Sequence, residues 1–116
     1  MARKVLLLYE PDLLFSSWIE SSCRKAGFDV KVLATENELQ QAVKEQVPRI
    51  WLVSLDSLKD GWKALTGLVR GTCRLIGYYS HVNSKLGQEA LANGFDAAIP
   101  RRALSAALDE VLADTD

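Results

Sequence analysis

The stretch PRIWLVSLD, residues 48–56, decides how this chain is expected to fold. Proline and arginine lead into four consecutive apolar residues, which give way to Ser54 and Asp56. A short apolar run with such borders is typical of a strand buried on both faces. Strands of that kind form parallel sheets whose two faces are covered by helices. The stretch therefore predicts an α/β protein.

The remainder of the chain repeats this pattern, with helical spacing of apolar residues between the strands. Strands separated by helices cannot pair as hairpins, so they form a parallel sheet through right-handed crossovers. A length of 116 residues fits one compact domain. We therefore expect a single domain over residues 1–116 with a doubly wound, five-stranded parallel sheet. The expected strands are residues 4–9, 29–33, 50–55, 75–79 and 97–99.

Local signals indicate where the helices begin and end. Asp12 can cap a helix that Gly27 ends, and Thr35 with Glu38 has the spacing of a capping box. Gly94 is expected to end the fourth helix. The five expected apolar stripes are Phe15, Ile19, Cys23 and Ala26; Leu39, Ala42 and Val43; Trp62, Leu65, Leu68 and Val69; Leu86, Ala90 and Leu91; and Leu104, Leu108 and Val111.

Composition and charge exclude several classes of function. Apolar residues make up 48% of the chain and charged residues 25%, which is ordinary for a globular protein. The net charge of −1 leaves no positive excess for direct binding of nucleic acid. No apolar run approaches the ~20 residues that span a bilayer, so we expect a cytoplasmic protein that does not contact a membrane. Cys23 and Cys73 lack the spacing of a metal or redox motif and are expected to be free, buried thiols.

The functional site is expected where the strands end. In a doubly wound sheet, ligands bind in the crevice beyond the carboxyl ends of the strands. The residues that occupy this edge are Tyr9, Glu10, Pro11 and Asp12 after the first strand, Ser54, Leu55 and Asp56 after the third, Ser80 and His81 after the fourth, and Pro100, Arg101 and Arg102 after the fifth.

On these residues, the chain resembles the receiver domain of two-component response regulators over essentially its whole length. Receivers carry an acidic pair after the first strand, an aspartate acceptor ending the third, Thr or Ser after the fourth, and Lys-Pro after the fifth. The run that begins at Pro48 and ends at Ser54 matches the stretch leading to the acceptor, and Asp60-Gly61 matches the turn that follows it. The resemblance implies the receiver strand order, 2-1-3-4-5.

Several receiver landmarks are altered in this sequence. Ser54 stands at the acceptor position, and only Glu10 of the acidic pair is present. A receiver carboxylate attacks a phosphoryl group while Mg²⁺ neutralises the developing charge, whereas a serine hydroxyl would need a base. Arg101 stands at the lysine position, where its wide guanidinium cannot replace an ammonium group, and we expect it to pair with Glu10. Ser80 keeps the small hydroxyl, and Ala98 replaces the aromatic residue that relays activation.

The altered landmarks favour a pseudo-receiver that binds a protein partner of a signalling pathway without being phosphorylated. We expect no cofactor, and weak magnesium binding or none. Asp12 and Asp56 could add to Glu10 as residual cation ligands, although a helix cap and a loop carboxylate are the simpler roles. Two alternatives stay open: a functional phosphoacceptor that uses Asp56 or Ser54 with a rearranged metal site, and an unrelated small α/β ligand-binding module.

Catalysis of another kind is not expected. His81 lies next to Ser80, but adjacent residues seldom point at each other and no acid is spaced to orient them. The sequence also contains no glycine-rich loop of the kinds that bind nucleotides. We therefore expect a protein that is not an enzyme.

The remaining prediction concerns an interface. Receivers commonly pair through the face formed by the fourth helix, fifth strand and fifth helix, so we expect homodimerisation there, with an ordinary solvated surface as the alternative. Exposed aromatic residues would be candidate anchors of an interface, although most such residues belong to the core. The candidate interface residues are Ala98, Arg101, Arg102 and Asp109, and the candidate aromatic anchors are Trp62, Tyr78 and Tyr79.

Overall fold

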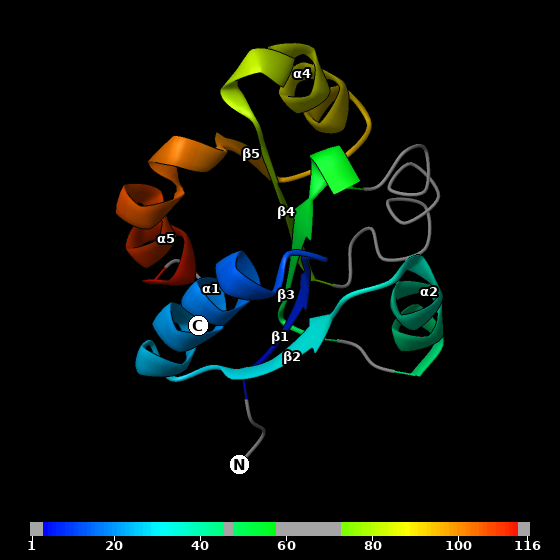
Figure 1. Ribbon diagram of the computed structural model, residues 1–116, viewed down its shortest axis with the longest axis vertical. Coiled ribbons are helices and arrows are strands. Elements are labelled where there is room, and N and C mark those ends of the chain that lie inside the picture. The colour runs from blue at the N-terminus through cyan, green and yellow to red at the C-terminus, as the bar shows by residue number, and fades with distance from the viewer. Residues whose placement is uncertain (1–3, 46–47, 58–72, 114–116) are drawn as a thin grey trace.

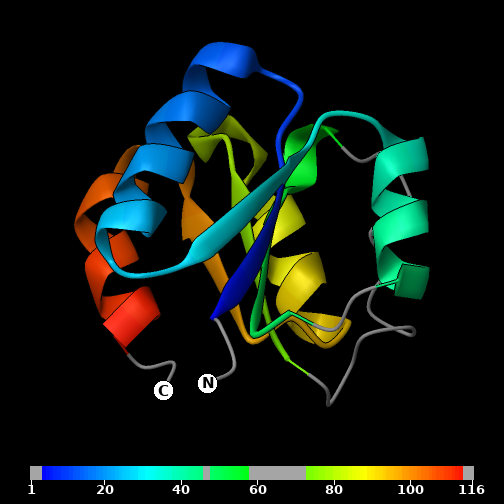
Figure 2. The same ribbon diagram turned by 90° about the horizontal axis from the view of Figure 1, so that it is seen from below.

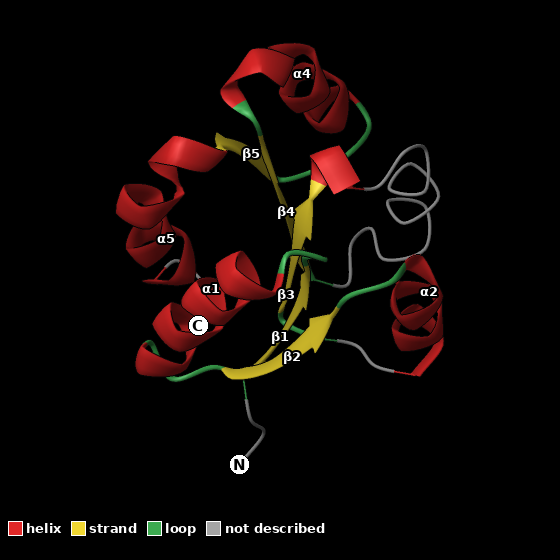
Figure 3. Ribbon diagram, in the orientation of Figure 1, coloured by secondary structure: helices red, strands yellow, loops and turns green. Residues whose placement is uncertain are grey.

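The structure, a computed structural model, describes residues 4–45, 48–57 and 73–113. Its strands form one parallel sheet in the order β2-β1-β3-β4-β5, as Figures 1 and 3 show, so the predicted fold class and strand order are confirmed. The strands are β1 (Val5–Tyr9), β2 (Asp29–Leu33), β3 (Ile50–Ser54), β4 (Arg74–Tyr79) and β5 (Ala97–Pro100). The helices are α1 (Leu13–Lys25), α2 (Glu36–Glu45), α4 (Ser84–Ala92) and α5 (Leu104–Ala113), with short 3-10 turns η1 (Leu55–Ser57), η2 (His81–Asn83) and η3 (Arg101–Ala103).

The alternation of side chains along the strands divides the core into two layers. On β1, Leu6 and Leu8 face the layer that contains α1 and α5, whereas Leu7 and Tyr9 face the layer that contains α2 and α4. Figures 1 and 2 show α1 and α5 together on one side of the sheet and α2 on the other. Because both faces of the sheet are covered, the central strands β1 and β3 are almost continuously apolar, as the opening stretch predicted, whereas the edge strand β2 alternates between buried and exposed residues.

The local signals for the helix ends are confirmed. The Oδ1 atom of Asp12 accepts hydrogen bonds from the backbone N–H groups of the first turn of α1, at 3.0 and 3.1 Å. Gly27 and Gly94 follow α1 and α4 with φ values of 96° and 108°, a conformation that favours glycine. The Oγ1 atom of Thr35 accepts from the N–H of Glu38, whose carboxylate in turn accepts from the N–H of Ala34.

Some details of the helices differ from the predictions. Ala26 and Leu91, both assigned to buried stripes, are exposed, because Ala26 is the C-cap of α1 and Leu91 lies on the outer face of α4. Ser16 is buried instead, since its hydroxyl can donate to the carbonyl of Leu13 one turn earlier. The third predicted helix, with Trp62, lies outside the described residues.

None of the helices in the described ranges is long and apolar enough to cross a membrane. Cys23 is buried, as predicted, and forms no disulfide, whereas Cys73 is half-buried.

Candidate functional site at the carboxyl ends of the strands

The topology brings the predicted site residues to one edge of the sheet. The strand order reverses between β1 and β3, so Glu10 after β1 lies beside the end of β3, where Ser54 is paired in register with Tyr78 of β4. Arg101 follows β5 at the same edge. This is the crevice in which doubly wound folds bind ligands.

Glu10 is buried at this edge, and both of its carboxylate oxygens are occupied. Only 3% of the residue is exposed. Its Oε1 atom accepts a hydrogen bond from the hydroxyl of Tyr78 at 2.7 Å, and its Oε2 atom accepts one from the backbone N–H of Asp12 at 3.1 Å. A buried carboxylate needs such donors, because an unpaired charge in the interior is strongly unfavourable.

Tyr78 supplies the stronger of these two contacts. Its side chain is 1% exposed, and its hydroxyl reaches Glu10 from a position 68 residues away in the sequence. Burial raises the pKa of Tyr78 well above its usual range, and the charge of Glu10 and the hydrogen bond to it raise it further, whereas Arg101 and Ser54 act in the opposite direction. The phenol is therefore neutral at physiological pH and donates to the carboxylate.

Aromatic side chains connect the Glu10–Tyr78 pair to the surface of the protein. The ring of Phe15 lies 5.7 Å from that of Tyr78 in an edge-to-face arrangement, and the guanidinium carbon of Arg101 lies 3.9 Å from the centre of the Phe15 ring. Within the described part of the chain, Arg101 forms no ion pair with Glu10, so the predicted pairing is wrong. The reason is that Tyr78 already contacts the carboxylate, while Phe15 offers the guanidinium a stacking surface.

Ser54, at the acceptor position, is 4% exposed. Its hydroxyl lies 2.9 Å from that of Ser57 in η1, and the carbonyl of Ser57 accepts a hydrogen bond from the hydroxyl of Tyr9 at 3.4 Å. A second hydroxyl is not a base, so this contact does not activate Ser54 as a nucleophile.

Asp56 joins the turn after β3 to the turn after β4. Its Oδ2 atom accepts from the backbone N–H of Ser80 at 2.6 Å, and its Oδ1 atom accepts from the side-chain amide of Asn83 in η2. Asp56 is exposed, but both of its oxygens already hold donors. The structure thus brings together Asp56 and Ser80, two residues that the sequence analysis named as candidates. The hydrogen bond between the Asp56 carboxylate and the Ser80 backbone N–H could not be predicted from sequence spacing.

The three carboxylates proposed as residual cation ligands each accept hydrogen bonds within the fold. Asp12 caps α1, Glu10 binds Tyr78, and Asp56 binds the turn after β4. Among the described residues, no group of three or more His, Cys, Asp or Glu side chains could hold a metal ion. Magnesium takes six oxygen ligands in octahedral geometry and is usually held by one or two available carboxylates. These three carboxylates therefore accept hydrogen bonds at separate points of this edge, and weak magnesium binding or none stays a prediction.

Of the candidate interface residues, Arg101 is the one that contacts the aromatic side chains beside Glu10. Arg102 and Asp109 are exposed, and Ala98 is half-buried in β5. Of the aromatic candidates, Tyr78 belongs to the core, Tyr79 is half-buried in the layer that contains α4, and Trp62 lies outside the described residues. The sequence reasoning missed Tyr78 and Phe15 as partners of the site. The available signal was the pair Tyr78-Tyr79 after Gly77, at the carboxyl end of the fourth strand.

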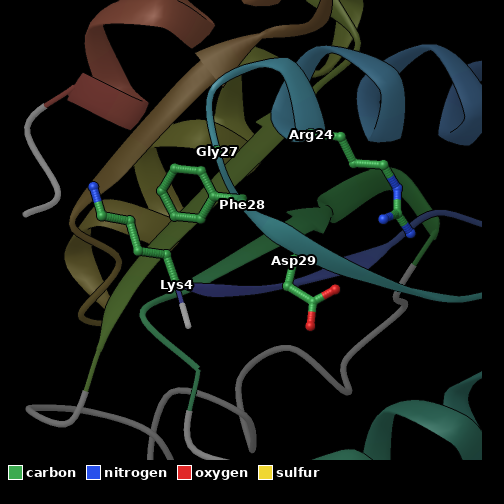
Figure 4. A pocket seen from close by; sticks show the side chains of 5 residues that line it. All are labelled: Lys4, Arg24, Gly27, Phe28 and Asp29. Atoms are coloured by element: carbon green, nitrogen blue, oxygen red, sulfur yellow. The ribbon is translucent and has the colours of Figure 1, made fainter. Parts of the chain in front are cut away.

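A separate pocket lies at the opposite edge of the sheet, where β1 and β2 begin. It has a volume of about 360 Å³ and is lined by Lys4, Arg24, Gly27, Phe28 and Asp29. Figure 4 shows that the charged groups of Lys4 and Arg24 point away from each other. The guanidinium of Arg24 donates to the carbonyl of Val30 and pairs with Glu20 at 2.8 Å. The two basic groups therefore do not converge on a common ligand.

Comparison with known proteins supports the architecture. No family model matches the sequence, and no curated protein matches it. Several solved structures match over 97% of this chain. The receiver domain of the Francisella response regulator 1452 is 16% identical, with 93% of that chain covered and a TM-score of 0.79. The receiver domain of Ssk1 from Saccharomyces cerevisiae, co-crystallised with the histidine phosphotransfer protein Ypd1, is 13% identical, with 88% of that chain covered and a TM-score of 0.82. A CheY-like receiver domain protein from Methanospirillum hungatei is 20% identical, with 96% of that chain covered and a TM-score of 0.78. The chain therefore has the fold of the receiver domains of response regulators.

Proposed function

We propose that this chain is an atypical receiver domain of two-component signalling, a pseudo-receiver that acts in the cytoplasm by binding a protein partner and is not phosphorylated. The observation that carries the proposal is the hydrogen bond of 2.7 Å between Tyr78 and the buried carboxylate of Glu10. The same acid is the one member of the receiver acidic pair that this sequence retains. Because Glu10 accepts a hydrogen bond from a core tyrosine, we assign it a structural role.

The energetics favour this role over metal binding. A cation that used the Oε1 atom of Glu10 would compete with the hydrogen bond from Tyr78 and could leave that buried phenol without its acceptor. A hydrogen bond to a charged group contributes about 1.5–3 kcal/mol, and an unsatisfied buried donor adds its own desolvation penalty. A cation would have to offset both terms with a ligand set to which neither Asp12 nor Asp56 contributes a free carboxylate.

The absence of a suitable acceptor supports the same conclusion. Ser54 is neutral, buried and paired with another hydroxyl, so it lacks the negative charge that attacks a phosphoryl group in receivers. Asp56 is the remaining candidate, and phosphorylation there would require it to release the Ser80 amide and Asn83. Protein recognition needs none of these groups. The Ssk1 receiver domain, which has the same fold, was solved in a complex with another signalling protein.

The test is intact mass after incubation with acetyl phosphate and Mg²⁺, together with tryptophan fluorescence during titration with beryllofluoride and Mg²⁺. We expect no phosphoryl adduct and no saturable fluorescence change, with a conventional receiver treated in parallel as the positive control. The Asp56→Ala variant identifies the site of any adduct. An adduct that forms on the wild-type protein and is absent from Asp56→Ala would overturn the proposal in favour of a phosphoacceptor with a rearranged site.

A further inference from the structure

One lateral edge of the sheet is formed by β2. Within the described ranges β2 pairs with β1 alone, and Figure 1 shows it at the lower end of the sheet. An edge strand presents a row of N–H and C=O groups that can pair with a strand of another chain. The backbone groups of β2 that point away from β1 therefore decide whether a second chain can add to this sheet.

The hydrogen bonds between β1 and β2 show which backbone groups point outward. The N–H of Asp29 donates to the carbonyl of the residue before β1 at 2.7 Å, and the carbonyl of Leu33 accepts from the residue after β1 at 3.1 Å. Residues that face the neighbouring strand alternate with residues that face away from it. Lys31 therefore also faces β1, whereas Val30 and Val32 direct their N–H and C=O groups outward.

Arg24 covers one of these outward groups. Its Nη2 atom donates a hydrogen bond to the carbonyl of Val30 at 3.2 Å. Gly27 turns the chain sharply after α1, with a φ of 96°, so the last turn of α1 lies beside the beginning of β2. Glu20, one turn earlier in α1, forms an ion pair with the guanidinium at 2.8 Å. The guanidinium is therefore held over the edge of the sheet, where an added strand would have to bind.

The ends of this edge restrict how two copies of β2 could pair. A symmetric, antiparallel pair is centred on one residue or on one pair of residues. Registers centred on Val30 or on Val32 would need the N–H of Phe28 or of Ala34, respectively. Those groups already donate to the carbonyl of Cys23 at 3.1 Å and to the carboxylate of Glu38 at 3.2 Å. The available register is therefore the one in which Val30 of one copy pairs with Val32 of the other.

Lys31 opposes pairing in this available register. When Val30 pairs with Val32 of the second copy, Lys31 lies directly opposite the same lysine of that copy. Lys31 is exposed, and like charges directly opposite each other on paired strands are destabilising. Pairing of two copies would thus have to displace Arg24 from the carbonyl of Val30 and also bring two lysines together.

We propose that Arg24 and Lys31 keep the free edge of β2 closed to a second copy of this chain. Charged side chains on edge strands are a common means by which proteins avoid pairing from edge to edge. A second copy is the partner that matters, because its own β2 presents the same outward groups in the matching register. The proposal goes beyond the proposed function, since this edge is separate from the residues that follow the carboxyl ends of the strands.

Sedimentation equilibrium of the wild type and of the double variant Arg24→Ala/Lys31→Thr tests the proposal. The first substitution uncovers the carbonyl of Val30, and the second removes the like charge and introduces a residue that favours strands. We expect the double variant to self-associate with a dissociation constant at least about tenfold lower than that of the wild type. The matched control is Lys25→Ala/Lys44→Ala, which removes two positive charges at exposed positions of α1 and α2 and should behave as the wild type.

Two further measurements locate the association on the edge of β2. Val32→Pro removes an outward N–H that pairing needs, whereas the ladder with β1 does not use this N–H, so the fold should tolerate the change. Added to Arg24→Ala/Lys31→Thr, it should abolish self-association. In the associated double variant, hydrogen exchange should become slower at the outward amides of Val30 and Val32 and stay unchanged at Lys31, which already faces β1.

An Arg24→Ala/Lys31→Thr variant that associates no more strongly than the control would overturn the proposal. Association that persists after Val32→Pro, with the amides of Val30 and Val32 still unprotected, would place the contact on another surface and also overturn it. Circular dichroism identifies a proline variant that does not fold, in which case the exchange pattern of the double variant decides the outcome alone. The acetyl phosphate experiment reports on a different edge of the sheet, so either proposal can fail without the other.

Discussion

Replacement of Tyr78 by phenylalanine tests the contact on which the site depends. The substitution removes one oxygen atom and leaves the ring in place, so the packing against Phe15 is retained. Glu10 then keeps only the N–H of Asp12 as a donor while remaining 3% exposed. The loss of a buried hydrogen bond to a charged group should lower the free energy of unfolding by about 2 kcal/mol and the Tm by roughly 8 °C.

The pH dependence gives this prediction a second readout. The pKa of Tyr78 is raised in the folded state, so its proton is retained when the unfolded tyrosine, with a pKa of 10.0, loses its own. The contribution of Tyr78 to stability is therefore complete below pH 10 and should fall above it by up to about 1.4 kcal/mol per pH unit. Tyr78→Phe should have a shallower decline than the wild type above pH 10.

Urea unfolding, followed by tryptophan fluorescence and circular dichroism between pH 7 and pH 11, measures both effects. The adjacent variant Tyr79→Phe is the control for the loss of stability at pH 7, because Tyr79 belongs to the opposite layer and should not show that loss. A double-mutant cycle with Glu10→Gln should yield a coupling energy of about 1 kcal/mol or more between the two side chains. If Tyr78→Phe were as stable as the wild type and equally sensitive to alkaline pH, the buried Tyr78–Glu10 contact would be refuted.

Three further predictions follow from packing, hydrogen bonding and burial. Gly77→Ala would place a Cβ atom 2.9 Å from three side-chain atoms of the buried Leu55, so unfolding measurements should show a loss of about 1–3 kcal/mol despite the better strand propensity of alanine. Asp56→Ala removes the acceptor of the Ser80 amide, whose hydrogen exchange should become faster by roughly five- to tenfold without global unfolding. Burial raises the pKa of the Cys23 thiol from 9.0 to about 12, so mass spectrometry should show no alkylation of Cys23 in the folded protein at pH 8. Above pH 9 the same thiol ionises in the unfolded chain but not in the folded one, so its contribution should lower the stability of the protein as pH rises.

The local features of the fold could be predicted from the sequence because their chemistry acts within a few residues. Asp12 caps α1, and Thr35 with Glu38 caps α2, through contacts that span two to four positions. Strand burial followed from the apolar runs for the same reason. The errors fell where tertiary context decides exposure, as at Leu91, an apolar residue with helical spacing that the neighbouring elements leave uncovered.

The candidate site could be located from the sequence, but its contacts could not. The topology of a doubly wound sheet placed Glu10, Ser54, Ser80 and Arg101 at one edge. The hydrogen-bond partner of Glu10 is Tyr78, which lies 68 residues away in a buried strand, and a tyrosine at such a position is normally predicted to be an ordinary core residue. Charge alone suggested Arg101 as that partner, whereas the structure satisfies Glu10 with a neutral phenol and leaves the guanidinium on Phe15.

This arrangement connects the altered site to the exposed surface of α1. The hydroxyl of Tyr78 donates to the carboxylate of Glu10, its ring packs edge-to-face with that of Phe15, and Phe15 contacts both the ring of Trp18 and the guanidinium of Arg101. A chain of ring contacts therefore joins Arg101 and Trp18 at the surface to a tyrosine in the core. If these rings act as one unit, Tyr78→Ala, which removes the ring, should shift the indole N–H signal of Trp18 in ¹⁵N spectra, whereas Tyr78→Phe, which keeps the ring, should leave that signal nearly unchanged. The two variants thus separate the hydrogen bond between Tyr78 and Glu10 from the aromatic packing that extends to Trp18.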